Sequence, residues 1–326
     1  MRITAIAGGV GGARFIRGLL AHLAASPDPD RRDAEVTVVG NTGDDITLFG
    51  LRVCPDLDTV MYTLGGGISA ERGWGREDES FRVRDELAAY GAGPAWFGLG
   101  DLDIATHLLR AQWLGEGATL TEVTARLCDR WRPGVRLLPA TDDAVETHVT
   151  LVDGRTVHFQ EWWVRLHAEV AATDITVTGA EAADPAPGVV DAIHDADVVV
   201  LPPSNPVVSV GAILSVPGIR EAVRTTPAPV IGLSPIVGGA PVRGMADACL
   251  DAIGVETSAG AVARHYGRRP EGLLDGWLVD EVDKAVADEL VEEGWPARAV
   301  PLMMTDVDAT AAMAQAALDL ATELRK

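Results

Sequence analysis

The chain has 326 residues, of which 47% are hydrophobic, and it carries a formal net charge of -21. Because this charge repels nucleic acid at long range, we expect no DNA or RNA partner. No apolar run approaches the roughly 20 residues of a membrane span, and the first apolar stretch is too short for a signal peptide, so we expect no membrane insertion and a cytoplasmic location. The three cysteines are scattered without C-x-x-C spacing, and we interpret them as buried thiols.

Short apolar stretches, often β-branched, predict strands along the whole chain. Several are continuous rather than alternating, which is typical of strands covered on both faces in a parallel α/β sheet. The predicted strands are residues 3–7, 36–39, 95–99, 198–201, 230–233, 277–279 and 299–303.

Helical patterns lie between these strands, at residues 15–25, 81–90, 119–131 and from about 305 to the C-terminus. The third begins with a capping box, Thr119 with Glu122. An alternating stretch with Asp153-Gly154 at its centre predicts a β-hairpin. We therefore expect an α/β fold over residues 1–326, a single Rossmann-like three-layer nucleotide-binding domain. Its sheet is mostly parallel, with an inserted helical region around 60–135 and the hairpin as additions.

Glycines and small polar or acidic residues follow the predicted strands. In open α/β sheets, ligands bind outside the carboxyl ends of the strands, so these segments predict a binding site. They are "GGVGGAR", "GNTGDD", "GLGDLD", "PPSNP", "SPIVGG", "DEVD" and "MTD".

The glycine turn at residues 8–12 does not fit the common nucleotide fingerprints. A nicotinamide loop needs a third glycine where this chain has Arg14, and a Walker loop needs a lysine that is absent here. What remains is a strand, a glycine turn and a helix N-terminus, which suits a phosphate of another nucleotide. A tight turn without any ligand is the alternative.

Asp44 and Asp45 follow the second predicted strand. Two adjacent carboxylates point in different directions, so we expect at most one of them to face a bound ion. Hard oxygen ligands of this kind suit Mg²⁺. The alternative is a solvated surface pair.

The segment "WFGLGDLDIATHLLR" offers several candidates at a third strand end. Asp103 is positioned to cap the following helix, which leaves Asp101 free to face the cleft. Arg110 is a phosphate candidate, whereas His107 is more typical of a packed helix residue. Trp96 is suited to form a wall for a flat ring, with a core role as the alternative.

Ser204 and Asn205 follow a further strand in "LPPSNPVVSVGAIL". They are suited either to cap a helix or to bind phosphate oxygens, and both interpretations remain open. The chain has no Cys/His cluster, no HExxH and no GxSxG, so zinc hydrolysis and serine esterase chemistry lack support.

Segments along nearly the whole chain resemble, in the same order, the 2-phospho-L-lactate transferase family of coenzyme F420 biosynthesis. They are "AGGVGGARFIRGL", "VGNTGDD", "CPDLDTVMYTLGG", "GWGR", "WFGLGDLDIATHLLR", "LPPSNPVVSVGAIL", "GLSPIVGG" and "PLMMTD". The resemblance implies that a phospho-carboxylate moves from a guanosine diphosphate conjugate to the ribityl hydroxyl of the deazaflavin Fo, releasing GMP, with Mg²⁺. It also suggests a homodimer.

The donated group is 2-phospholactate in one form of the family and phosphoenolpyruvate in the actinobacterial form. Lysine occurs only twice among the 27 basic residues, a bias that favours an actinobacterial source and hence the enolpyruvyl donor. By the same resemblance, Asp45 and Arg84 lie at Fo-contact positions. The glycine turn, with Ser204 and Asn205, would hold the phosphates of the guanosine nucleotide.

These arguments define a candidate site with three roles. We expect Asp45 and Arg110 to be catalytic and Asp44 and Asp45 to be metal ligands. The expected ligand-binding residues are Gly9, Gly11, Gly12, Asn41, Asp45, Arg84, Trp96, Asp101, Ser204 and Asn205.

A second function class has similar motifs. Regulators in the same superfamily bind UDP-sugars and have a similar glycine turn and "PSNP" loop, so these motifs do not discriminate. The aromatic segments "GWGR" and "WFGLGD" resemble the deazaflavin-binding side and favour the transferase.

Overall fold

The structure is a computed structural model that describes residues 1–69, 71–94 and 96–325. Its centre is a seven-stranded sheet in the order β14-β13-β10-β9-β1-β2-β5, and every neighbouring pair is parallel. The strands are β1 (Arg2–Ala7), β2 (Glu35–Gly40), β5 (Arg136–Pro139), β9 (Val198–Leu201), β10 (Val230–Leu233), β13 (Gly276–Val279) and β14 (Ala297–Ala299).

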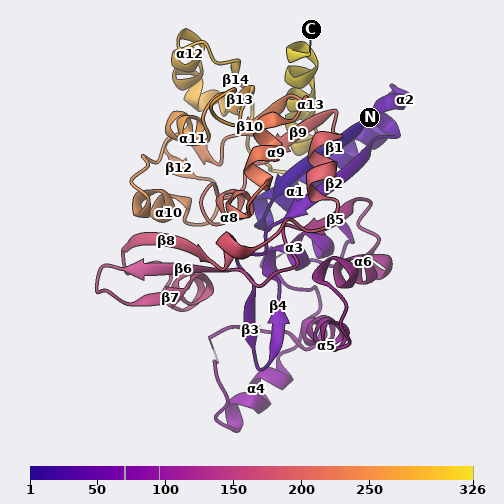
Figure 1. The fold of residues 1–326 in the computed structure, drawn as a ribbon, viewed down its shortest axis with the longest axis vertical. Helices are drawn as coiled ribbons and strands as arrows, with labels where there is room; N and C mark the ends of the chain where they lie inside the picture. The colour runs from indigo at the N-terminus through magenta and orange to yellow at the C-terminus, as the bar shows by residue number, and fades with distance from the viewer. Residues whose placement is uncertain (70, 95, 326) are drawn as a thin grey trace.

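Helices cover both faces of this sheet, which confirms the three-layer α/β prediction (Figure 1). One face packs against α1 (Gly9–Ala25), α3 (Pro55–Leu64), α6 (Leu120–Trp131) and α13 (Val307–Leu324). The other packs against α7 (Val189–His194), α8 (Val210–Ser215), α9 (Ile219–Thr225), α10 (Ala246–Ala252), α11 (Ala259–Tyr266) and α12 (Lys284–Glu292). The central strands are buried on both faces, as their continuous apolar runs predict.

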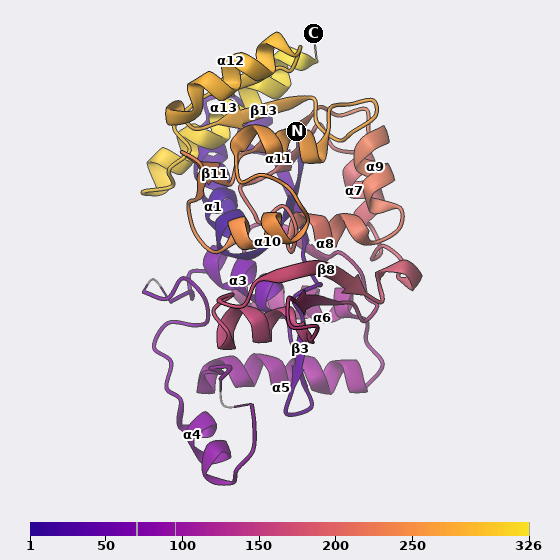
Figure 2. The same cartoon turned by 90° about the vertical axis from the view of Figure 1, so that its left-hand side faces the viewer.

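The insertion between β2 and β5 contains a small hairpin as well as helices. The hairpin is β3 (Ile46–Leu48) and β4 (Leu51–Val53), and the helices added to α3 and α6 are α4 (Arg82–Ala89) and α5 (Asp101–Gly115). Figures 1 and 2 show the hairpin projecting away from the main sheet, with α4 at the far end of the molecule.

A second addition confirms the predicted hairpin around Asp153-Gly154. β6 (Glu146–Leu151) pairs with β7 (Thr156–His158), and β8 (Ala172–Thr178) adds a third antiparallel strand. Gly154 has φ of 84°, which suits a residue without a side chain. The other elements are α2 (Pro29–Arg32), η1 (Glu161–Arg165), η2 (Ala180–Ala182), β11 (Ile236–Val237), β12 (Ala240–Pro241) and η3 (Glu281–Asp283).

Three element predictions need correction. The strand predicted at 95–99 is wrong for residues 96–99, which form a turn and irregular structure packed on the β3–β4 hairpin; Ala95 lies outside the described residues. The last strand lies at 297–299 rather than 299–303. The sequence analysis also missed β5, because its short apolar run ends in a proline.

Among the residues that the structure describes, none of the helices has the length and apolar character needed to span a membrane.

Candidate functional site

The candidate site lies where the carboxyl ends of three neighbouring strands meet. α1 begins directly after β1, residues 41–45 follow β2, and residues 202–209 follow β9. The predicted glycine turn is the first turn of α1, with Gly8 as an extended N-cap and Gly9 at φ of 62°. No acidic side chain of α1 lies in that turn, but the carboxylate of Asp56 from α3 lies against it and accepts a hydrogen bond from the backbone of Gly9.

The glycines of α1 allow the helix to contact the loop after β9 closely. A Cβ atom at Gly11 would overlap the carbonyl oxygen of Pro203, and one at Gly12 would lie 2.7 Å from the Ser204 hydroxyl oxygen. The Ser204 hydroxyl donates to the carbonyl of Gly8 at 2.9 Å. Helix and loop therefore form one unit at the strand ends.

Asn205 caps its own loop. Its side-chain oxygen accepts hydrogen bonds from the backbone N–H groups of Val207 and Val208, at 2.9 and 3.2 Å. These contacts close a turn before α8, whose N-cap is Ser209, so Asn205 does not cap that helix. Ser204 makes its contacts with the glycine turn, so both residues shape the cleft in this structure.

Asp56, which the sequence analysis did not identify, lies against the glycine turn. It is in the first turn of α3, is 7% exposed and accepts a hydrogen bond at 2.9 Å from the side-chain amide of Asn41. A Cβ atom at Gly8 would overlap its carboxylate, so only glycine admits it there. Burial raises the pKa of Asp56 to about 6.

Asn41 is fully engaged in holding this arrangement together. Its amide nitrogen also donates to the carbonyl of Val208 at 3.1 Å, and its oxygen accepts from the backbone of Gly43 at 2.8 Å. Asn41 therefore joins the end of β2, the start of α3 and the loop after β9.

Asp44 and Asp45 are both buried, with exposed fractions of 5% and 4%, so the solvated surface pair is excluded. They face different partners, as expected. The carboxylate of Asp45 accepts from Arg52 Nε at 2.9 Å and from Cys54 Sγ at 3.0 Å through the same oxygen, Oδ2. Asp44 lies near Asp56, whose negative charge adds to burial in raising the pKa of Asp44.

Each of these two carboxylates keeps a buried oxygen without a partner among the described residues, the Oδ1 atoms of Asp44 and Asp45. Burial also raises the pKa of Asp45, despite the nearby guanidinium of Arg52. Unpaired buried carboxylate oxygens are costly unless a cation binds them. Carboxylate oxygens of this kind suit Mg²⁺, but among the described residues Asp44, Asp45 and Asp56 do not form a group whose ligand atoms all lie within 4.8 Å of one another.

The three-stranded sheet supports the backbone of this pair. His158, at the end of β7, donates from Nε2 to the carbonyl of Asp45 at 3.0 Å, because its Nδ1 accepts from the backbone of Gln160. The Gln160 side chain lies 3.5 Å from the carbonyl of Asp44. This contact spans more than 110 residues of sequence, so the sequence pattern offered no signal for it.

Arg110 does not reach the cleft. Its exposed fraction is 1%, its guanidinium pairs with Asp58 of α3, and it lies 3.0 Å from His107 Nδ1 and 3.3 Å from the carbonyl of Arg52. These contacts do not support the predicted phosphate-binding role. We interpret Arg110 as a positioning residue that connects α3, α5 and β4, while His107 is packed, as its helical context indicates.

Asp58, Asp103 and His107 offer ligand atoms within 4.8 Å of one another. The guanidinium of Arg110 donates to Oδ1 of Asp58 and to Nδ1 of His107, whereas Oδ2 of Asp58 and Nε2 of His107 have no hydrogen-bond partner among the described residues. Tyr62 adds a hydrogen bond to Asp103 at 2.7 Å. Because Arg110 places a positive charge against two of the three side chains, we interpret this cluster as a structural network beneath the site.

The predictions that Asp103 caps α5 and that Asp101 is free to face the cleft are both wrong. Asp101 is not free: it accepts from the Ser80 hydroxyl at 2.6 Å and from the backbone of Val83 at 3.0 Å, at the start of α4. Asp103 does not cap α5. Glu79 does so instead, accepting from the first backbone N–H groups of that helix at 2.8 Å.

Arg84 and Trp96 lie in the projecting insertion. Arg84 pairs with its neighbour Asp85 and stacks on Phe81 in α4, which Figures 1 and 2 place beyond the tip of the hairpin. The structure thus does not bring Arg84 next to Asp45. Trp96 is half-buried and packs against Ile46 and the rest of the β3–β4 cluster.

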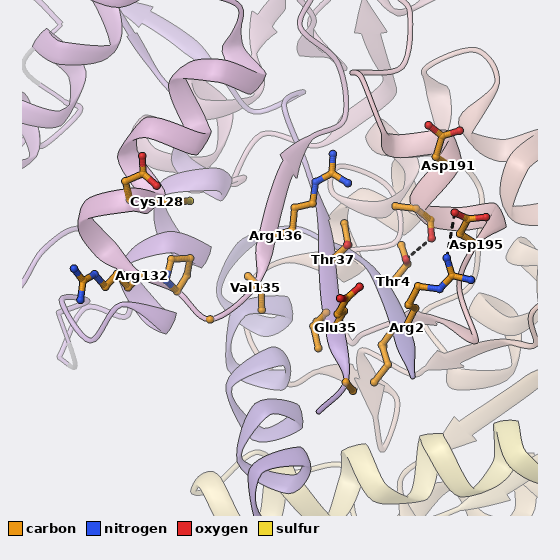
Figure 3. Close-up of a pocket in the computed structure, with 17 residues that line it drawn as sticks. Arg2, Thr4, Glu35, Thr37, Cys128, Arg132, Val135, Arg136, Asp191 and Asp195 are labelled. Atoms are coloured by element: carbon orange, nitrogen blue, oxygen red, sulfur yellow. Dashed lines mark hydrogen bonds and ion pairs between the residues drawn. The ribbon is translucent and has the colours of Figure 1, made fainter. Parts of the chain in front are cut away.

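A cavity of about 760 Å³ lies at the amino ends of the strands, opposite to the candidate site (Figure 3). It is lined by the starts of β1, β2 and β5, where Thr4, Thr37 and Arg136 lie across three adjacent strands. The buried carboxylates and the glycine turn are at the opposite edge. This cavity is therefore separate from the candidate site.

Comparisons with known proteins show the family of this chain. The profile of the 2-phospho-L-lactate transferase CofD family matches residues 3–318. A phosphoenolpyruvate transferase from Streptomyces griseus is 65% identical over 328 residues, covering all of both chains. Proteins with the same name from Thermobifida fusca and a Mycobacterium species are 62% and 56% identical, and each alignment covers at least 98% of this chain and 99% of the relative.

A solved structure also shares the fold. A member of the UPF0052 family from Bacillus halodurans aligns with a TM-score of 0.61 and 18% sequence identity, covering 97% of this chain and 99% of that chain.

Proposed function

Since the chain belongs to the 2-phospho-L-lactate transferase CofD family and is a transferase of coenzyme F420 biosynthesis, we propose its substrates and its reaction. It transfers phosphoenolpyruvate from enolpyruvyl-diphospho-5'-guanosine to the ribityl hydroxyl of Fo and releases GMP, giving dehydro-F420-0. The observation that carries the choice of donor is the set of full-length relatives named phosphoenolpyruvate transferase at 55–65% identity.

In this reaction the hydroxyl oxygen of Fo attacks the phosphorus that bears the enolpyruvyl group. A new P–O bond forms there, and the bond from that phosphorus to the oxygen shared with GMP breaks. Such transition states spread negative charge over the phosphoryl oxygens, so positioning and charge neutralisation contribute more than a strong base. Bound Mg²⁺ supplies part of that neutralisation.

We assign the carboxylates to this chemistry by their free oxygens. Oδ2 of Asp45 is held by Arg52 and Cys54, so its free Oδ1 is the atom that accepts the proton of the ribityl hydroxyl or contacts the metal ion. Asp44 and Asp56, which lie near each other, would hold Mg²⁺ beside the first turn of α1.

The nucleotide and the deazaflavin then approach from different elements. In this proposal the phosphates of the donor bind near the N-terminus of α1 and the loop containing Ser204, where the glycines allow a close approach to the backbone. The flat ring of Fo lies toward the insertion, where Trp74 is 44% exposed and Trp96 is half-buried. The enzyme acts as a homodimer in this proposal, as the resemblance suggests.

The substitution Asp45→Asn tests the proposed chemistry. The amide keeps the size of the side chain but loses the negative charge and the ability to accept a proton, so we expect transfer to Fo to fall by orders of magnitude while folding is retained. The assay measures GMP and dehydro-F420-0 from Fo, the enolpyruvyl donor and Mg²⁺. Asp308→Asn, on the exposed side of α13, is the matched control and keeps full activity. An active Asp45→Asn enzyme would refute the assignment.

A further inference from the structure

Arg14 and Arg243 are two neighbouring cations that lack an acidic partner among the described residues. Most ion pairs of this molecule join an arginine to a carboxylate, on a chain with a net charge of -21. Arg14 has no hydrogen bond, ion pair or ring contact within the described part of the chain, although it is only half-exposed. Arg243 is exposed, so both guanidinium groups are open to an anion that approaches from solvent.

Arg14 lies close to the end of α1 that we propose for the phosphates. It follows Gly11 by three residues, so the two share one face of the helix. Gly11 marks the face that contacts the loop after β9. The Arg14 side chain therefore extends the positive end of α1 along the rim of the cleft.

Arg243 is held in place by the loop after α3. It follows β12, and its Nη2 donates to the carbonyl of Arg72 at 2.6 Å. Gly73 has φ of 73°, and a Cβ atom there would lie 2.7 Å from both terminal nitrogens of Arg243. The guanidinium thus packs flat against the backbone of Gly73, where another residue would displace it.

The guanidinium groups of Arg14 and Arg243 lie close enough for their charges to interact. Partial burial lowers the pKa of Arg243, and the positive charge of Arg14 lowers it further. Two guanidinium groups repel each other, so an arrangement of this kind gains stability when an anion binds between them.

We infer that Arg14 and Arg243 form a clamp for the carboxylate-bearing end of the donor, which in the proposed function is an enolpyruvyl phosphate. That group carries a carboxylate and a phosphate on neighbouring atoms, and two planar guanidinium groups match this pair of anions. GDP has no carboxylate. The clamp therefore distinguishes the loaded donor from the bare nucleotide, and this inference rests on the proposed function.

The test compares the affinity of the protein for the donor with its affinity for GDP, measured by calorimetry in Mg²⁺. We expect the wild type to bind the donor more tightly than GDP. Arg14→Gln and Arg243→Gln should each weaken donor binding by about tenfold or more, while GDP binding changes by less than about threefold. Arg17→Gln is the control, because Arg17 is exposed on the same helix, and it should leave both affinities unchanged.

Each other result overturns the inference in an identifiable way. If the wild type binds the donor no more tightly than GDP, the protein does not recognise the carboxylate. If both variants lose donor and GDP affinity equally, the arginines bind the diphosphate. If Arg14→Gln and Arg243→Gln keep the donor affinity of the wild type while Fo is still converted, the clamp is wrong. If the wild type forms no product from Fo, the proposed function itself is wrong.

Discussion

Asp44, Asp45 and Asp56 bring three buried carboxylates to the strand ends, and Arg52 is the partner of only one of them. Burial is the largest cause of the raised pKa of each. A protein retains such an arrangement at a cost in stability. A divalent cation would remove that cost, which is why we propose these residues as metal ligands.

Asp56→Asn separates this assignment from a purely structural role. Because the substitution removes negative charge next to Asp44, we expect the metal-free protein to melt at the same or a higher temperature. Mg²⁺ affinity measured by calorimetry should fall by roughly 10- to 100-fold. Unchanged Mg²⁺ affinity would contradict the assignment.

Asp58→Asn is the matched control on the same helix. It leaves the buried Arg110 without its carboxylate, so we expect a lower melting temperature and unchanged Mg²⁺ affinity in the folded protein.

Sequence reasoning identified Asp44, Asp45 and Asn41 because they directly follow a strand. It missed Asp56, since the β3–β4 hairpin returns the chain to the same strand end and no local pattern records that return. It misjudged Arg110 for a related reason: helical spacing gives the turn on which a residue lies, but not whether another helix covers it.

Among the elements, the contact between α1 and the loop after β9 shapes the part of the site that we propose for the nucleotide. Gly11 and Gly18 are both helical glycines of α1, yet they face different neighbours. A Cβ atom at Gly11 would overlap the Pro203 carbonyl, whereas one at Gly18 would overlap Thr310 of α13. Substitutions at Gly11 and at Gly18 therefore distinguish an effect on ligand binding from an effect on helix packing.

Gly11→Ala should move the loop away from the helix and weaken GDP binding by about tenfold, because the phosphate-binding backbone groups no longer align. Gly18→Ala should instead destabilise the fold by about 1–3 kcal/mol through overpacking and leave GDP affinity unchanged. Denaturant unfolding and calorimetry measure the two effects. Equal GDP affinities in the wild type and Gly11→Ala would argue against the nucleotide role of this turn.

Element prediction succeeded where the signal was local. The Thr119–Glu122 capping box and the Asp153-Gly154 turn are both present as predicted. The apolar stretch at 95–99 misled because aromatic residues that pack on a hairpin resemble a buried strand. Asp101 accepts a hydrogen bond from the first turn of α4, and Glu79 accepts one from the first turn of α5. This exchange of caps depends on the folded insertion, so the local sequence does not indicate it.

Over the whole molecule, the charge of -21 opposes the binding of an anionic donor. The positive end of α1 and the side chain of Arg14 lie near the carboxyl end of β1 and oppose this repulsion locally. The parallel sheet could be predicted from its buried runs. Its strand order could not, because the order depends on which helices pack together far along the chain.

We propose that this protein binds Fo at Asp45, and a fluorescence titration measures that binding. Fo is titrated into the protein with Mg²⁺ and GDP present, for the wild type and for Asp45→Asn. We predict saturable binding that the substitution weakens by about tenfold or more. No binding of Fo by the folded wild type, together with tight binding of a UDP-sugar, would contradict the transferase account and indicate a regulator.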